Sequence, residues 1–156
     1  MKITVPQFTA QFPTLALGLT SEEQASLLNA LEMEDFSAGE TLIVDGTPTD
    51  SLFLVWSGKL NVVIHTATGE HEVAVVGPGS MLGEVSILDP GPSTATVRTE
   101  QGCVVLSLGR KKLQELWREH PRVAAKFLAT LTRGLASRIR QVTNELNRLD
   151  ANMMGA

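Results

Sequence analysis

Residues 77–97 read GPGSMLGEVSILDPGPSTATV, and the other predicted elements are arranged around this stretch. Glycine adopts positive φ without strain and proline fixes φ, so clusters of the two mark turns. The pattern predicts a tight turn, a stub of helix that begins near Gly83-Glu84, and a Pro-Gly-Pro loop over 90–92. The more regular segments on either side are expected to be strands.

The chemistry of this stretch suggests a binding site for a sugar phosphate. The first N–H groups of a helix lack acceptors and favour an anion, and a helix that starts at Gly83-Glu84 would present such donors. The carboxylate of Glu84 only accepts hydrogen bonds, so it suits a neighbouring sugar hydroxyl. The alternative is that glycine and proline only punctuate a loop and that Glu84 is solvated at a helix N-terminus.

The length and composition predict one domain in a reducing compartment. A chain of 156 residues with 43% apolar residues is long enough to bury about two-thirds of its unfolded surface. Cys103 is the single cysteine. It cannot form an internal disulfide, so we expect a small hydrophobic strand residue in a cytoplasmic protein. The N-terminus lacks the apolar core of a secretory signal, and no run reaches membrane-spanning length.

The charge balance argues against nucleic-acid binding. The formal net charge is -4 and the pI is about 5.4. A protein that binds nucleic acid needs a basic surface to neutralise phosphates. We therefore expect no direct DNA binding, and no membrane partner either.

The apolar pattern changes from helical to strand-like near residue 36. Thr20 is a candidate N-cap followed by carboxylates, and the leucines after it have helical spacing, which predicts a helix over about 21–31. Alternation and frequent glycine then predict short strands over 41–44, 51–56, 59–66, 72–76, 95–99 and 103–108. Short strands at regular spacing are typical of a β sandwich or barrel.

Two helices are expected at the C-terminal end. Leu113, Leu116 and Trp117 define the apolar face of a short helix. It should begin near residue 110 and end at His120, because the residue before a proline avoids the helical region. A longer helix should follow over about 122–149.

The second half of the long helix carries a seam of apolar residues, spaced by four and three positions in alternation: Leu135, Ile139, Val142, Leu146 and Leu149. This alternation is typical of a two-helix interface, and charged residues flank it. We therefore expect a homodimer through this helix. The alternative is that the helix packs only against its own β domain.

Four segments in order resemble the cyclic nucleotide-binding domain family, in the form found in regulators similar to the cAMP receptor protein. They are DSLFLVWSGKL at 50–60, Pro-Gly at 78–79, GEVSIL at 83–88 and ATV at 95–97, and the resemblance extends over about 19–140. It implies a mainly β fold, a β jelly roll (double-stranded β-helix) with flanking helices. The single domain would comprise a helical part at 1–35, the jelly roll at 36–109 with its cassette at 77–97, and helices at 110–150. The implied ligand is cAMP or cGMP, with no cofactor and no metal.

The resemblance carries the family's ligand-binding residues to Gly83, Glu84, Val85, Ser86, Ser93 and Thr94. The first four match the family, in which the glutamate accepts the ribose 2′-hydroxyl and its neighbours present backbone N–H groups to the ribose and phosphate. Thr94 keeps a hydroxyl. Ser93, however, stands where the family has the arginine that pairs with the phosphate oxygens.

The missing arginine should weaken the binding of a cyclic phosphate by about 10-fold or more, because a guanidinium offers charge and a second donor. Arg98 lies five residues beyond Ser93, so it should face the opposite side of a regular strand. Arg133 or Arg138 on the last helix could instead reach the site.

Two classes of function are consistent with these residues. The first is a cyclic nucleotide sensor or regulatory domain, in which ligand changes the geometry of the dimer seam. The second is a degenerate relative that uses the fold as a ligand-independent, dimeric interaction scaffold. Glu84 favours the first, and Ser93 favours the second.

The last residues and the histidines of the sequence indicate whether a DNA-binding segment, a metal site or an enzyme is expected. After Asp150 only six residues remain, where transcription factors of this family continue into a helix-turn-helix, so a stand-alone domain is expected. His65, His71 and His120 do not have the spacing of a metal-binding cupin site, and no Ser/His/Asp set stands out. An enzyme is therefore not expected.

Overall fold

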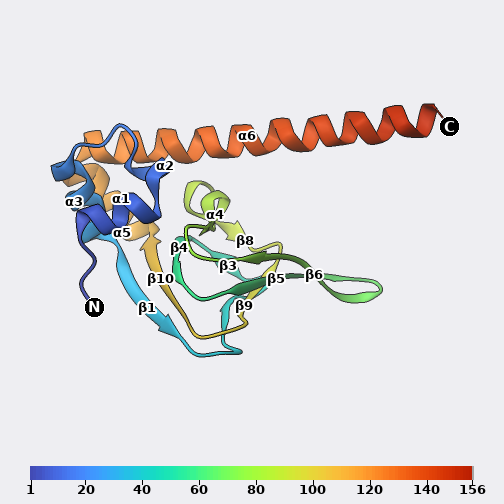
Figure 1. Cartoon of the computed structure of the whole chain (residues 1–156), viewed down its shortest axis with the longest axis horizontal. Coiled ribbons are helices and arrows are strands. Elements are labelled where there is room, and N and C mark those ends of the chain that lie inside the picture. Colours follow the sequence, from blue (N-terminus) through green and yellow to red (C-terminus); the bar gives the residue numbers. More distant parts are fainter. Residues whose placement is uncertain (156) are drawn as a thin grey trace.

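The computed structural model describes residues 1–155, in which helices precede and follow the strands along the chain and gather at one side of the β domain (Figure 1). The N-terminal helices are α1 (Val5–Gln11), α2 (Pro13–Ala16) and α3 (Ser21–Ala30). The strands are β1 (Glu32–Phe36), β2 (Thr41–Ile43), β3 (Pro48–Thr49), β4 (Ser51–Ser57), β5 (Leu60–Thr66), β6 (Gly69–Val76), β7 (Met81–Leu82), β8 (Gly91–Pro92), β9 (Thr96–Thr99) and β10 (Cys103–Gly109). The remaining helices are α4 (Glu84–Leu88), α5 (Arg110–Glu119) and α6 (Pro121–Met154).

The strands form a β jelly roll, as the sequence predicted. One sheet has the strand order β1-β10-β4-β7, the other has β2-β9-β5-β6, and β3 pairs with β8. Neighbouring strands are antiparallel throughout residues 1–155. The chain passes from β4 in one sheet to β5 in the other at Gly58, which has a φ of 89°. A side chain at Gly58 would collide with Cys103 and the carbonyl of Gly102, so only glycine fits this crossing.

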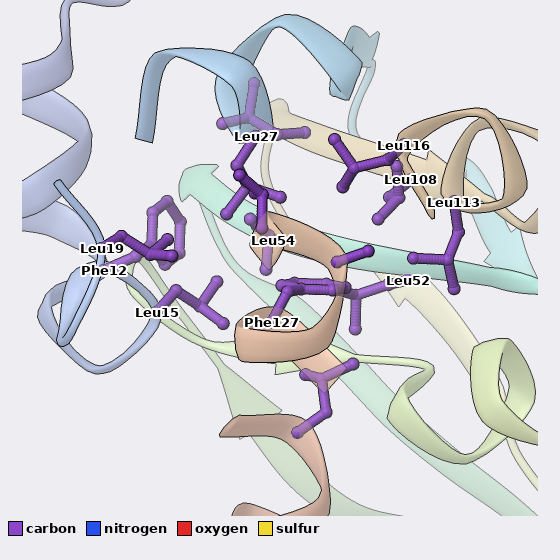
Figure 2. Packing of buried hydrophobic residues seen from close by; sticks show 14 of the residues in the cluster. Phe12, Leu15, Leu19, Leu27, Leu52, Leu54, Leu108, Leu113, Leu116 and Phe127 are labelled. Carbon is purple, nitrogen blue, oxygen red and sulfur yellow. The ribbon is translucent and has the colours of Figure 1, made fainter. Parts of the chain in front are cut away.

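The larger hydrophobic core lies between the first sheet and the helices (Figure 2). Leu52 and Leu54 of β4 and Leu108 of β10 are fully buried and face this core. Leu27 of α3 and Phe127 of α6 pack against them. Full burial of one such side chain contributes about 1.5–3 kcal/mol, so this cluster fixes the helices from both ends of the chain to one face of the sheet.

A second core fills the interior of the roll. Its buried members are Ile43, Val55, Leu60, Val97, Cys103 and Val105. Burial raises the pKa of the Cys103 thiol, and the nearby carboxylates of Glu40 and Asp35 add to the rise. Cys103 is therefore the small strand hydrophobe that the sequence predicted.

Local sequence signals account for the helix ends. Thr20 and Glu23 form a capping box in which each side chain accepts a hydrogen bond from the other's backbone N–H, and α3 begins directly after Thr20. α5 ends and α6 begins at His120-Pro121, as predicted. The predicted strands are present, with ends that differ by a few residues.

The sequence prediction missed six elements, the helices α1 and α2 and the short strands β1, β3, β7 and β8. α1 begins with a capping box between Thr4 and Gln7 and has proline in its first turn, a signal that was present in the sequence. β1 is an edge strand that pairs only with β10 and has a largely charged sequence, so it lacks the alternation of a half-buried strand. Because β1 begins at Glu32, the sheet starts before residue 36.

The predicted apolar face of α5 is partly wrong. Leu113 and Leu116 are buried, but Trp117 is half exposed and lies at a hollow between α4, α5 and α6. Its neighbours on α5 face the sheet and leave the indole at the edge of the contact.

Helix α6 extends to Met154 and runs along the whole molecule, and its C-terminal half projects beyond the body (Figure 1). Its buried residues end at Leu131. Beyond this point the seam residues Ile139, Val142, Leu146 and Leu149 are exposed. Among residues 1–155, no helix is both long and apolar enough to cross a membrane.

Candidate functional site

A cavity of about 400 Å³ lies beside α4. Its lining residues are Ile43, Val62, Leu82, Gly83, Glu84, Val85, Ser86, Pro92, Ser93, Thr94, Ala95 and Val97. The six ligand-binding residues predicted from the sequence are all among them. The structure thus brings the start of α4 and the loop before β9 to one cavity.

The turn into α4 depends on Gly83. This residue has a φ of 84°, the left-handed conformation, and a Cβ atom there would collide with the carbonyl oxygen of Ser51. The N–H of Ile87 donates to the Gly83 carbonyl oxygen at 3.1 Å and closes the first turn. No side chain caps this helix. The N–H groups of Glu84, Val85 and Ser86 are therefore available to a ligand in the cavity.

The carboxylate of Glu84 is buried and paired. Glu84 is 6% exposed, and its Oε1 lies 2.5 Å from Nη2 of Arg138, which belongs to α6. A buried carboxylate without a partner is costly, and Arg138 supplies that partner from α6. Of the two arginines that the sequence left open, Arg138 reaches the site, whereas Arg133 lines a separate hollow beside Lys126.

Ser93 uses its hydroxyl within its own turn. Its Oγ donates to the carbonyl oxygen of Ala95 at 2.7 Å and accepts from the Ala95 N–H at 3.3 Å. Its backbone bonds to the preceding loop, with the Ser93 N–H donating to the Thr47 carbonyl and the Gly46 N–H donating to the Ser93 carbonyl, both at 2.8 Å. The cavity lining has no basic side chain at this position or elsewhere.

A hydroxyl pair links the start of α4, at the cavity, to a neighbouring strand. Oγ1 of Thr49 donates to Oγ of Ser86 at 2.9 Å and so ties α4 to β3. β3 in turn pairs with β8, where Thr49 lies opposite Gly91. The loop that leads to Ser93 and Thr94 is thereby connected to the start of α4.

Arg98 does not line the cavity, in agreement with the sequence prediction. Its Nη1 lies 2.5 Å from Oε1 of Glu70 on β6, at the outer surface of the sheet. This hydrogen bond lowers the pKa of the Glu70 carboxyl below its usual value of 4.5. Arg98 therefore stabilises the β9-β5-β6 edge.

The sequence prediction missed the apolar part of the cavity. Ile43, Val62, Leu82 and Val97 form this surface and come from four strands. The alternation of Leu60 and Val62 marked inward positions on β5, but it could not distinguish a cavity wall from ordinary core. Among residues 1–155, no group of three His, Cys, Asp or Glu side chains could hold a metal ion.

Comparisons with known proteins identify the family. The profile described as "Cyclic nucleotide-binding domain" matches residues 33–120, more than half of the chain. The chain therefore belongs to the cyclic nucleotide-binding domain family.

Two relatives illustrate the match. The "CRP-like cAMP-activated global transcriptional regulator" of Mycobacterium tuberculosis is 32% identical over 130 residues, which are 83% of this chain and 56% of that protein. The N-terminal domain of a transcriptional regulator from Streptomyces coelicolor is 34% identical, with a TM-score of 0.73, and the match covers 80% of this chain and 90% of that one. The chain thus spans little more than half the length of the Mycobacterium relative.

A third relative differs in its response to ligand. The regulatory subunit of a "cAMP-independent protein kinase A" from Trypanosoma brucei has a TM-score of 0.69 at 26% identity, covering 84% of this chain and 46% of that one. A variant of that subunit with three substitutions, one of which introduces an arginine, is bound to cAMP. The printed names of these three relatives describe transcriptional regulators and a kinase regulatory subunit.

Proposed function

We propose that this chain is a regulatory sensor domain that binds cAMP or cGMP in the cavity beside α4 and transmits binding through α6. The observation that carries the proposal is the single cavity that combines a buried carboxylate, Glu84, with the uncapped first turn of α4. The ribose 2′-hydroxyl would donate to Glu84. The phosphate would accept from the N–H groups of Val85 and Ser86, and the base would lie against the apolar strands.

The proposal includes a homodimer formed by two copies of α6. Of the seam residues, Leu135 is half-buried, whereas the four from Ile139 onward are exposed, with Val142 59% and Leu146 62% exposed. Their alternate spacing by three and four suits a second identical helix, and Arg138 and Glu145 lie next to the seam at the g positions of its heptads. A seam of large apolar side chains in water favours a partner that covers it.

The proposal also includes the cellular compartment and the domain organisation. We place the domain in the cytoplasm, because its one thiol, Cys103, is free and buried. The N-terminal helices, the jelly roll, which includes β1, and the C-terminal helices would act as the parts of one domain that binds a small molecule rather than DNA and performs no catalysis. The shared core of Leu27, Leu54 and Phe127, which joins the N-terminal helices, the sheet and α6, supports one unit.

A second candidate is the ligand-independent dimeric scaffold, and one observation favours it. Ser93 has no free donor for a phosphate, because its hydroxyl already donates to Ala95. The relative from Trypanosoma brucei, described as cAMP-independent, supports the idea that domains of this family can work without cAMP, and its arginine-containing variant bound to cAMP suggests that such sites can be restored.

Calorimetric titration of the purified chain separates the two candidates. The sensor predicts saturable heat with cAMP or cGMP, and a cyclic dinucleotide is titrated beside them as a larger ligand. Absence of heat and of thermal stabilisation with millimolar cAMP and cGMP would reject the sensor and leave the scaffold.

A further inference from the structure

The cavity presents a charge problem for the proposed ligand. A cyclic nucleotide carries one negative charge, and the cavity already contains the carboxylate of Glu84 while its lining has no basic side chain. Two like charges within a few ångströms of each other in a partly buried site repel each other strongly. A site that accepts this ligand therefore needs a cation from outside the lining.

Arg138 is the basic residue in position to supply it. Within residues 1–155, it alone forms an ion pair with a residue of the cavity lining. Its guanidinium has five donors, and Nη2 alone is engaged, with Oε1 of Glu84. Its side chain is 56% exposed, so the remaining donors can turn toward a ligand without loss of buried contacts.

We propose that Arg138 is the ligand-binding cation of this site and takes the part of the arginine that Ser93 replaces. The inference rests on the proposed function and deepens it. Arg138 would keep its bond to Oε1 of Glu84, leaving Oε2 for the ribose hydroxyl, and would direct its other N–H groups to the phosphate. The anionic group of the ligand is then recognised from α6 rather than from the cassette strand.

The same ion pair also allows Arg138 to oppose ligand binding, and the experiment must distinguish this effect from phosphate binding. If Arg138 only occupied the carboxylate that the ribose needs, it would compete with the ligand, and its removal would tighten binding. A phosphate-binding Arg138 predicts the reverse. Comparison of cAMP with adenosine isolates the phosphate contact, because the two share base and ribose and differ in the charged group.

The test titrates cAMP and adenosine into the parent chain and into Arg138→Ala, Arg138→Lys and Arg140→Ala. Arg138→Ala should weaken cAMP about 10-fold to 150-fold, the range for loss of a charge-assisted bond, and weaken adenosine much less. Arg138→Lys should fall between, because it keeps charge and loses the planar fork. Arg140→Ala is the matched control, since Arg140 lies on α6 and makes no ion pair within residues 1–155.

The Arg138→Ala substitution made in the Ser93→Arg variant checks whether Arg138 binds the phosphate. In Ser93→Arg, a cassette guanidinium would share the phosphate, so removal of Arg138 should cost less cAMP affinity there than in the parent. The inference is overturned if Arg138→Ala binds cAMP as tightly as the parent or more tightly, or if cAMP and adenosine weaken equally. If the parent binds neither compound, the proposed function fails and this inference falls with it.

Discussion

Arg138 Nη2 lies 2.5 Å from Glu84 Oε1 although the two residues are 54 positions apart in sequence. The contact joins the start of α4 to the half of α6 that projects from the body. Ile139, the next residue after Arg138, belongs to the exposed seam. Any ligand that moves Glu84 or Arg138 therefore acts on the helix that carries the proposed dimer interface.

Glu84→Ala should abolish measurable nucleotide binding. The change removes the acceptor for the ribose hydroxyl and leaves Arg138 without its partner, while the small side chain keeps α4 helical. Calorimetry with cAMP, cGMP and adenosine checks the result. A circular dichroism melt close to that of the parent is the control for folding, and unchanged affinity would exclude Glu84 from the site.

Gly83→Ala should destabilise the fold more than a comparable change elsewhere. Gly39 is the matched control, because its φ of 83° is nearly the same as the 84° of Gly83 while a Cβ there meets no atom within 4 Å. Gly39→Ala should cost about 1–2 kcal/mol from backbone strain alone. Gly83→Ala should cost about 1–3 kcal/mol more, because the new Cβ collides with Ser51. Urea unfolding measures both, and equal losses would contradict the collision.

Much of the cavity could be predicted from the sequence because its signals are local. A glycine before a carboxylate and a short apolar run, with proline-rich turns after it, predicts α4 and places Glu84 at its start. The sequence could not decide whether Arg138 or Arg133 reaches the cavity. The arginine that faces the cavity depends on how α6 is rotated, and Phe127 and Leu131 fix that rotation through contacts with the distant core. The bond from Ser93 to Ala95 was likewise invisible, since a serine in a loop has many possible partners.

The ion pair between Glu23 and Lys126 should make stability depend on acid pH. A hydrogen bond from Lys126, at 2.7 Å from Oε2, lowers the pKa of Glu23 in the folded state below its usual value of 4.5. The pair therefore adds stability above pH 4.5, and this contribution disappears as the pH falls through the lower folded value. Glu23→Gln should lower the urea midpoint at pH 7 and have a smaller effect at pH 3.

Glutamine is the appropriate replacement in this experiment. It can still accept the capping bond from the Thr20 N–H, so α3 keeps its start and only the charge is lost. A difference between parent and variant that stays the same at both pH values would show that the charge of Glu23 contributes nothing.

Val142→Asp should convert the proposed dimer to a monomer. Val142 is exposed in the single chain, so aspartate there leaves the domain folded. In a two-helix seam the same change would bury an unpaired charge, at a cost of several kcal/mol. Light scattering after size exclusion measures the mass. Asn144→Asp adds the same charge on the opposite face of α6 and should remain dimeric, and a parent chain with the mass of a monomer would reject the interface.

Ser93→Arg should tighten cyclic nucleotide binding. The variant adds a guanidinium to a cavity wall that has no basic side chain, beside backbone donors that are already in place. A buried charge-assisted bond should contribute about 1–3 kcal/mol, or about 5-fold to 150-fold in affinity. The loss of the Ser93 bond to Ala95 will reduce this gain.

Ser93→Ala is the control, because it removes that bond without adding charge. Titration with cAMP and cGMP at two salt concentrations should show the gain for Ser93→Arg alone, and more strongly at low salt. Equal affinities for the parent and Ser93→Arg would mean that the phosphate does not lie against this wall of the cavity.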